Sequence, residues 1–134
     1  MKLEVGMYVR TNRGNIDKIL LVEYAEEKRQ DYPNHPSKSY WRDKIFLSKE
    51  RYWRTSQNII KASYNIIDLI EVGDYINGYK VYDDFRLNKD DYGINFIEIG
   101  IESDKFLNHY IREEDIKSIV TKEQFESMSY KVGE

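Results

Sequence analysis

Residues 40–54 alternate basic and aromatic side chains, and this stretch of the chain is the best suited to bind a partner. An arginine donates two hydrogen bonds at once to a phosphate or a carboxylate, and a tryptophan or tyrosine ring offers a flat face for stacking. The same residue types are enriched at the centres of protein–protein interfaces. The candidate partner-binding residues are Tyr40, Trp41, Arg42, Lys44, Arg51, Tyr52, Trp53 and Arg54.

Three interpretations of this segment stay open from the sequence. It forms a protein interface, it forms a nucleotide or nucleic-acid site, or Trp41, Phe46 and Trp53 anchor the segment to the rest of the protein while its charges face water. The isoelectric point of about 5.5 argues against broad, non-specific affinity for nucleic acid, because such affinity is built on neutralising phosphates.

Charge is divided unevenly along the chain. Residues 27–60 carry eight basic and four acidic side chains, whereas residues 61–134 carry nine basic and sixteen acidic ones. The acidic part could present carboxylates to a basic partner, such as a nucleic-acid-binding protein. Solvated strand faces account for most of this charge.

Groups that could catalyse a reaction are sparse. Acidic side chains cluster at residues 83–84, 90–91 and 113–115, and such clusters bind Mg²⁺ in nucleases. The accompanying arrangement of lysine or histidine is missing, and aspartate is also common in plain turns. His35 and His109 lie far apart, and the chain has no cysteine. We therefore expect a protein that is not an enzyme and has no metal or cofactor, and a metal-dependent nuclease is the least favoured alternative.

The chain contains an internal repeat that must position these residues. Residues 3–9 (LEVGMYV) and 70–76 (IEVGDYI) share the pattern aliphatic-Glu-Val-Gly-x-Tyr-aliphatic, 67 positions apart, and a repeat of this kind indicates a duplicated structural unit. Residues 65–70 and 115–120 resemble each other at an offset of 50. The repeat predicts two domains, residues 1–69 and 70–134, with about 17 extra residues placed as an insertion in 27–54 of the first.

Each unit has the sequence pattern of short strands. Two apolar runs flank a turn at residues 12–15, and Asn77-Gly78 is typical of a tight hairpin turn because both positions accept a positive φ. Residues 94–101 alternate between apolar and polar side chains, as in a strand with one buried face.

The end of the chain predicts a short helix. A final strand is expected at residues 116–120, followed by a capping box formed by Thr121 and Gln124. The helix should run to about Met128, with Phe125 and Met128 on its inner face.

Five short strands with a tight turn before the last one are typical of a small SH3-like barrel. The opening at residues 5–9, the hairpin that follows it, and the Glu114-Asp115-Ile116 turn resemble the small barrels of KOW and Tudor type. The expected fold is therefore mainly β, with two tandem SH3-like small barrels and a short C-terminal helix. The alternative is one larger barrel or sandwich that uses strands from both halves.

Three stretches of the chain resemble short phage and prophage proteins of low-GC Gram-positive bacteria. They are residues 5–11 (VGMYVRT), 65–75 (NIIDLIEVGDY) and 120–126 (VTKEQFE). This resemblance implies a genomic setting rather than an activity.

In that setting we expect a counter-defence inhibitor, similar to anti-CRISPR proteins, that occludes a bacterial immune effector. The absence of cysteine, of a signal-peptide core and of a membrane-length apolar stretch favours the cytoplasm of the host bacterial cell. The alternative is a module that binds a nucleotide or a nucleic acid, including one that sequesters a signalling nucleotide.

Overall fold

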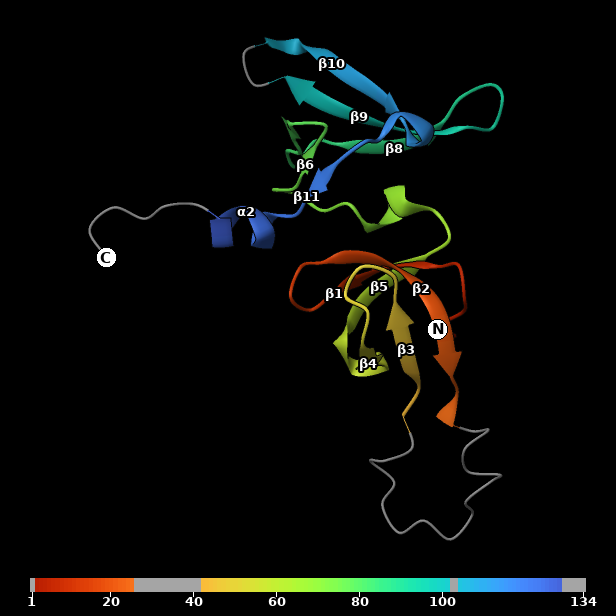
Figure 1. Cartoon of the computed structure of the whole chain (residues 1–134). Coiled ribbons are helices and arrows are strands. Elements are labelled where there is room, and N and C mark those ends of the chain that lie inside the picture. The colour runs from red at the N-terminus through yellow and green to blue at the C-terminus, as the bar shows by residue number, and fades with distance from the viewer. Residues whose placement is uncertain (1, 26–41, 102–103, 129–134) are drawn as a thin grey trace, which may run out of the picture. The chain divides into compact units, whose positions relative to one another are not determined.

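The computed structural model describes residues 2–25, 42–101 and 104–128. The fold is mainly β, with three antiparallel sheets and one short C-terminal helix, α2 (Lys122–Met128) (Figure 1). The chain divides into two compact units, Met1–Tyr64 and Asn65–Glu134, called unit 1 and unit 2 below. The expectations of a mainly β chain and of a C-terminal helix are confirmed.

Unit 1 is a single five-stranded sheet with the order β4-β3-β2-β1-β5. The first four strands follow one another as antiparallel neighbours, and the fifth returns to pair with the first. A short 3₁₀ helix, η2 (Ser56–Asn58), separates the last two strands. The strands are β1 (Tyr8–Thr11), β2 (Ile16–Glu23), β3 (Lys44–Leu47), β4 (Trp53–Thr55) and β5 (Ile59–Ser63).

The core of unit 1 includes residues from the segment that the sequence assigns to an insertion. Ile45 and Leu47 of β3 are fully buried, and they pack in one cluster with Val9 and Ile19. β3 also pairs with β2 on one side and with β4 on the other. Residues 44–55 are therefore part of the sheet itself, whereas residues 27–41 of the predicted insertion lie outside the described residues.

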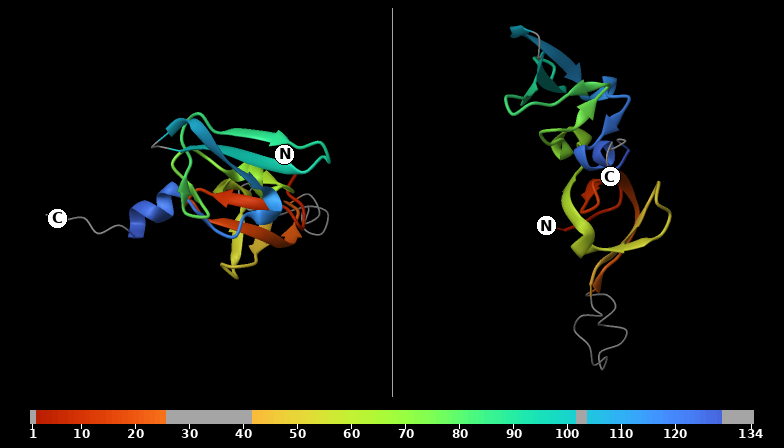
Figure 2. Two further views of the ribbon diagram at one scale, coloured as in Figure 1. Left: turned by 90° about the horizontal axis from the view of Figure 1, so that it is seen from above. Right: turned by 90° about the vertical axis from the view of Figure 1, so that its left-hand side faces the viewer.

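Unit 2 holds two three-stranded sheets, β10-β9-β8 and β11-β6-β7. Its core is a second cluster of isoleucine, valine and phenylalanine side chains that includes Ile76, Ile97 and Ile99. β9 and β10 lie side by side in a long hairpin, as both further views show (Figure 2). The elements of unit 2 are η3 (Ile66–Leu69), β6 (Tyr75–Ile76), β7 (Tyr79–Lys80), β8 (Arg86–Lys89), β9 (Asn95–Ile101), β10 (Asp104–Arg112), η4 (Glu113–Asp115), β11 (Ile119–Val120) and α2.

The repeated opening sequence forms the same local structure in both units. Gly6 and Gly73 both have a left-handed φ, +92° and +93°. The Gly6 N–H donates to the carbonyl of Ile19 at 3.0 Å, and the Gly73 N–H donates to that of Val81 at 2.9 Å. The repeated sequence thus forms the same backbone hydrogen bond in both units.

The second sequence match does not join equivalent elements. Residues 66–69 form the 3₁₀ helix η3, whereas Ile119 and Val120 form β11. Ile119 of β11 pairs with Ile76 of β6, and Ala62 of β5 pairs with Val9 of β1. Val9 and Ile76 are equivalent in the opening repeat, so Ala62 and Ile119 occupy equivalent positions. These counterpart positions are 57 apart rather than 50, so the predicted excess of 17 residues in the first unit is wrong.

None of the three sheets closes into a barrel through the strand pairings of the described residues. The expectation of two tandem SH3-like barrels is therefore not confirmed. The predicted hairpin at Asn77-Gly78 is confirmed, because β6 and β7 pair across it and both turn residues have a positive φ.

The capping box at the start of α2 is confirmed by two reciprocal hydrogen bonds. The Gln124 N–H donates to the Thr121 hydroxyl at 3.2 Å, and the Thr121 N–H donates to the Gln124 side chain at 3.1 Å. The expected inner face of this helix is wrong, because Met128 is 70% exposed and Phe125 is also exposed. Phe125 instead stacks on Tyr75 at a ring separation of 4.7 Å.

Candidate functional site

An apolar row crosses the outer face of the unit 1 sheet. Leu21 pairs with Phe46, and Phe46 pairs with Trp53, so the three side chains lie side by side on β2, β3 and β4. Leu21 is 53% exposed and Trp53 is 45% exposed, and the rings of Phe46 and Trp53 lie 5.6 Å apart. We call these three residues the outer row.

The opposite face of the same strands supplies the core, which explains why the outer row is exposed. Val22, Ile45 and Arg54 form the neighbouring row in the register, and successive side chains along a strand point to opposite faces. The burial of Ile45 therefore turns Phe46 outward. The Trp53 side chain is not part of the hydrophobic core. Its exposure disfavours the interpretation in which it anchors the segment to the rest of the protein.

The turn between β3 and β4 is held by a buried carboxylate. Asp17 is 3% exposed, and it accepts hydrogen bonds from the N–H groups of Lys49 at 2.9 Å and Glu50 at 3.1 Å. These bonds fix the chain just before Arg51, which has a left-handed φ of 56°. A left-handed conformation is unfavourable for a residue with a side chain, so the anchored turn holds Arg51 in place beside the outer row.

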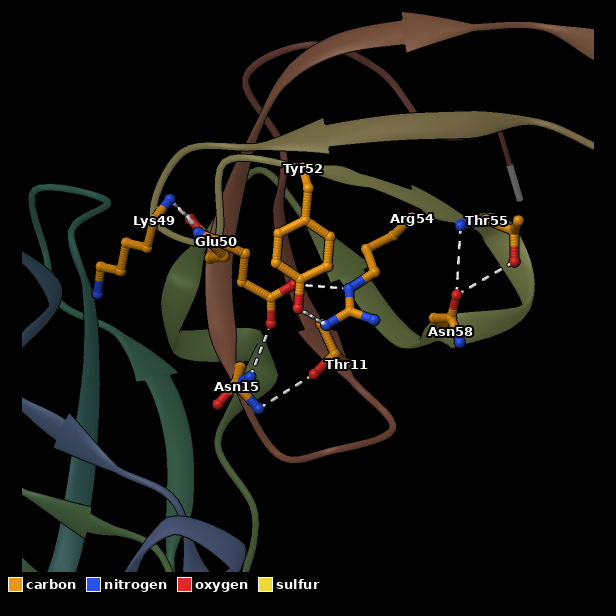
Figure 3. A network of polar contacts seen from close by, with 9 residues as sticks. Thr11, Asn15, Lys49, Glu50, Tyr52, Arg54, Thr55 and Asn58 are labelled. Carbon is orange, nitrogen blue, oxygen red and sulfur yellow. Dashed lines mark hydrogen bonds and ion pairs between the residues drawn. The ribbon is translucent and has the colours of Figure 1, made fainter.

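Arg54 is engaged within the protein (Figure 3). Its Nε lies 2.7 Å from Glu50 Oε2, and its guanidinium group also donates to the Tyr52 hydroxyl and lies 4.3 Å from the Tyr52 ring. Asn15 donates to the other Glu50 oxygen at 2.7 Å. The exposed ring of Tyr52 is thereby held by a network rather than left to rotate.

The network sets the charge states of its two ionic members. Burial acts to raise the pKa of Glu50, but the hydrogen bonds from Arg54 and Asn15 outweigh it, so the pKa lies below the ordinary value. The hydrogen bond to Glu50 raises the pKa of Arg54 above its ordinary value. Both groups are charged at neutral pH, and they form an ion pair with each other.

Five of the eight predicted site residues lie on β3, β4 and the turn between them, although Arg54 lies on the face opposite Trp53. These are Lys44, Arg51, Tyr52, Trp53 and Arg54. Arg42 is exposed and donates to the side chain of Gln57. Tyr40 and Trp41 lie outside the described residues.

Leu21 is a member of the outer row that the sequence analysis missed. The signal was present, because Leu20, Leu21 and Val22 are three successive apolar residues in one strand. Since neighbouring side chains point to opposite faces, such a run places an apolar side chain outward.

Unit 2 carries an exposed aromatic residue at the position equivalent to Trp53. Trp53 lies three residues before η2, and Tyr110 lies three residues before η4. Tyr110 is 66% exposed, and its ring lies 6.1 Å from that of Phe96. The sequence pattern predicted no strand between residues 101 and 116, so Tyr110 of β10 was missed.

Two of the three acidic clusters have members with a structural role. The Asp90 carboxylate accepts the N–H groups of Tyr92 and Ile94 and so forms a turn, and the Glu113 carboxylate accepts the N–H of Ile67 at 3.1 Å. Across the part of the chain that the structure describes, no three histidine or acidic side chains are grouped so as to hold a metal ion. In the same residues, no helix is long and apolar enough to cross a membrane.

Comparisons with known protein families, with curated proteins and with solved structures found no match to this chain.

Proposed function

We propose that this chain is a non-enzymatic binding protein that recognises another protein through the outer row and the adjoining turn. The observation that carries the proposal is the row itself, in which Leu21 and Trp53 are about half exposed on a regular sheet face. Exposed apolar side chains that adjoin one another mark interaction surfaces. Tryptophan, tyrosine and arginine are also the residues that dominate binding energy at such surfaces.

We assign different roles in binding to the residues of the outer row and of the adjoining turn. Trp53 and Tyr52 act as anchors, and Tyr52 is preorganised by its contacts with Arg54. Holding a side chain in its bound position lowers the entropy lost on association. Arg51 and Arg42 are exposed at the edge of the surface, where charges steer an acidic partner and raise its association rate.

We propose that the partner is a bacterial immune effector and that the chain blocks it sterically and electrostatically in the cytoplasm of the host cell. The resemblance of residues 5–11, 65–75 and 120–126 to phage proteins supports this setting. Such an inhibitor needs a surface complementary to its target, and the exposed outer row is our candidate for that surface.

We further propose that each unit belongs to the SH3-like class of small barrels. The strand order β4-β3-β2-β1-β5 in unit 1, with a 3₁₀ helix before the returning strand, supports this assignment. In unit 2 the same relation holds between β6, η4 and the returning strand β11.

The test is affinity capture from a lysate of the bacterial host with the wild-type chain and with Trp53→Ala. Truncation of a central aromatic residue costs about 2 kcal/mol or more at an interface, which is roughly a thirtyfold loss of affinity. We expect the partner to be captured by the wild type and largely lost with Trp53→Ala. Point variants suit this test better than removal of residues 30–54, because Ile45 and Leu47 belong to the core.

Tyr92→Ala is the matched control, because Tyr92 is a highly exposed aromatic residue of unit 2 and is not part of the outer row. It should capture the partner as well as the wild type does. Equal capture by Trp53→Ala and the wild type would show that the outer row is not the binding surface.

A further inference from the structure

Unit 2 contains a pocket that has no part in the surface proposed above. It has a volume of about 440 Å³ and is bordered by residues of the β6–β7 hairpin and of the β9–β10 hairpin. Pockets that bind small molecules have volumes of about 300–1,000 Å³, so this one is large enough. Its side-chain lining is formed by Tyr75, Tyr79, Lys80, Tyr82 and His109.

The aromatic rings of this pocket are supported by neighbouring side chains. The ring of Tyr79 lies 3.9 Å from that of His109, and the ring of Tyr75 lies 4.7 Å from that of Phe125. Tyr79 is still 44% exposed, so much of its surface is open to a ligand. Three tyrosines in one pocket favour a planar ring, because flat groups stack on aromatic side chains.

The lining offers a binding point for an anion at Lys80. Its amino group is contributed to a described lining that contains no acidic residue. Its Nζ lies 5.5 Å from the centre of the Tyr82 ring, which places the positive charge beside an aromatic wall. The Asp84 carboxylate lies beside Gly100, another residue of the pocket border, so an anionic group of a ligand would bind at Lys80 rather than near Gly100.

The backbone at Gly78 borders open space on one side of the pocket. Gly78 borders the pocket and has a left-handed φ of +84°, and no atom lies within 4 Å of the place where a Cβ would stand. Tyr79 and Lys80 follow Gly78 directly in the chain. No side chain at position 78 therefore covers the Tyr79 ring or the Lys80 amino group. A ligand that reaches over this turn can contact both side chains.

We propose that this pocket binds a nucleotide, with its base against the tyrosine rings and its phosphate at Lys80. A nucleotide combines a flat ring with an anionic group, which are the two features that the lining selects. The same chemistry is offered by a free nucleotide and by one residue of a single-stranded nucleic acid. The proposal does not depend on the outer row, because the pocket and the row lie in different units.

The first experiment is calorimetric titration of the full chain with adenosine monophosphate, uridine monophosphate, adenosine and inorganic phosphate, and with short single-stranded DNA and RNA. We expect saturable binding of a nucleotide, weaker binding of adenosine and no binding of inorganic phosphate. Binding of both the mononucleotides and the oligonucleotides supports a free nucleotide as the ligand, and binding of oligonucleotides alone supports a single strand. The proposal is overturned if no nucleotide or oligonucleotide binds, or if inorganic phosphate binds as tightly as adenosine monophosphate.

The second experiment uses four variants and the probe that binds most tightly in the first. Lys80→Ala and Tyr79→Ala should each weaken binding about tenfold or more, through loss of the charged hydrogen bond and of stacking. Tyr79→Phe keeps the ring and should bind like the wild type, which separates stacking from a defect in folding. Lys89→Ala is the matched control for the lost charge, since Lys89 is an exposed lysine of β8 outside this lining.

Unchanged affinity in Lys80→Ala and Tyr79→Ala, or an equal loss in Lys89→Ala, would overturn the assignment of the pocket. Trp53→Ala should leave nucleotide affinity unchanged while it weakens capture of the protein partner. The two proposals can therefore fail separately.

Discussion

Glu50 illustrates how a single carboxylate prepares the proposed surface. It accepts hydrogen bonds from Arg54 and Asn15, and Arg54 in turn holds the ring of Tyr52. Arg54 was expected to contact a partner, and that role stays a prediction, while its contacts within the chain give it a positioning role. The sequence predicted the residue types at the surface but not this pairing, because the turn that holds Glu50 and Arg54 in contact is hydrogen-bonded to Asp17, which is distant in the sequence.

We predict that the Glu50 network contributes stability that depends on pH. Because the pKa of Glu50 is lowered in the folded chain, this contribution is present above the unfolded pKa of about 4.5 and is lost as the pH falls through the folded pKa. Glu50→Gln should cost roughly 1 kcal/mol at pH 7 and flatten the acid side of the stability curve. Urea denaturation from pH 7 down to about pH 3 measures both effects.

Glu114→Gln is the control for that experiment, because Glu114 is an exposed carboxylate that lies 3.7 Å from an Arg112 nitrogen. It should leave the pH dependence close to that of the wild type. An identical acid profile for Glu50→Gln and the wild type would contradict the role assigned to Glu50.

At the scale of elements, local signals predicted the turns and caps, and longer-range pairing decided the rest. The Asn77-Gly78 turn and the Thr121 cap are set by a few neighbouring residues, so the sequence was sufficient. β3 is only four residues long, and its two core residues are surrounded by basic and aromatic side chains within the range that the repeat offsets assigned to an insertion. Its place in the sheet follows from pairing with β2 and β4, which no local pattern reveals.

The two copies of the opening turn allow a prediction with an internal control. Gly6 and Gly73 both require a left-handed φ, which costs a residue with a side chain about 1–2 kcal/mol. A Cβ at position 73 would also lie 3.2 Å from the Lys122 Cβ, whereas one at position 6 would meet its nearest atom, in Tyr64, at 3.9 Å. Gly73→Ala should therefore destabilise its unit more than Gly6→Ala does.

Chemical denaturation followed by circular dichroism measures the two losses of unfolding free energy. A loss for Gly6→Ala equal to or greater than that for Gly73→Ala would show that the close approach to Lys122 does not matter.

At the scale of the whole molecule, the chain has two separate hydrophobic cores. The cluster of unit 1 contains Ile45, the cluster of unit 2 contains Ile97, and the two clusters share no residue. The repeat in the sequence predicted two units divided between residues 69 and 70, whereas the compact units divide between Tyr64 and Asn65. The match at residues 65–70 and 115–120 was misleading, because similar isoleucine-rich runs serve a 3₁₀ helix in one case and a strand in the other.

We predict that Ile45→Ala and Ile97→Ala each weaken only their own unit, by about 2–5 kcal/mol. Both tryptophans, Trp41 and Trp53, belong to unit 1, so tryptophan fluorescence reports on that unit. Ile45→Ala should move the fluorescence transition to a lower denaturant concentration. Ile97→Ala should likewise lower the midpoint of a transition that is seen by circular dichroism alone. Equal shifts of the fluorescence transition in both variants would mean that the two units unfold as one.

The opening repeat has one position at which its chemistry changes, and this difference gives each opening its own surroundings. Met7 packs in the apolar cluster of unit 1, whereas its counterpart Asp74 is buried and accepts the N–H groups of Glu71 and Lys122. An exchange of the two openings would bury a carboxylate among apolar side chains and leave the start of α2 without its acceptor. An exchange of these two similar segments would thus carry the cost of a single misplaced charge.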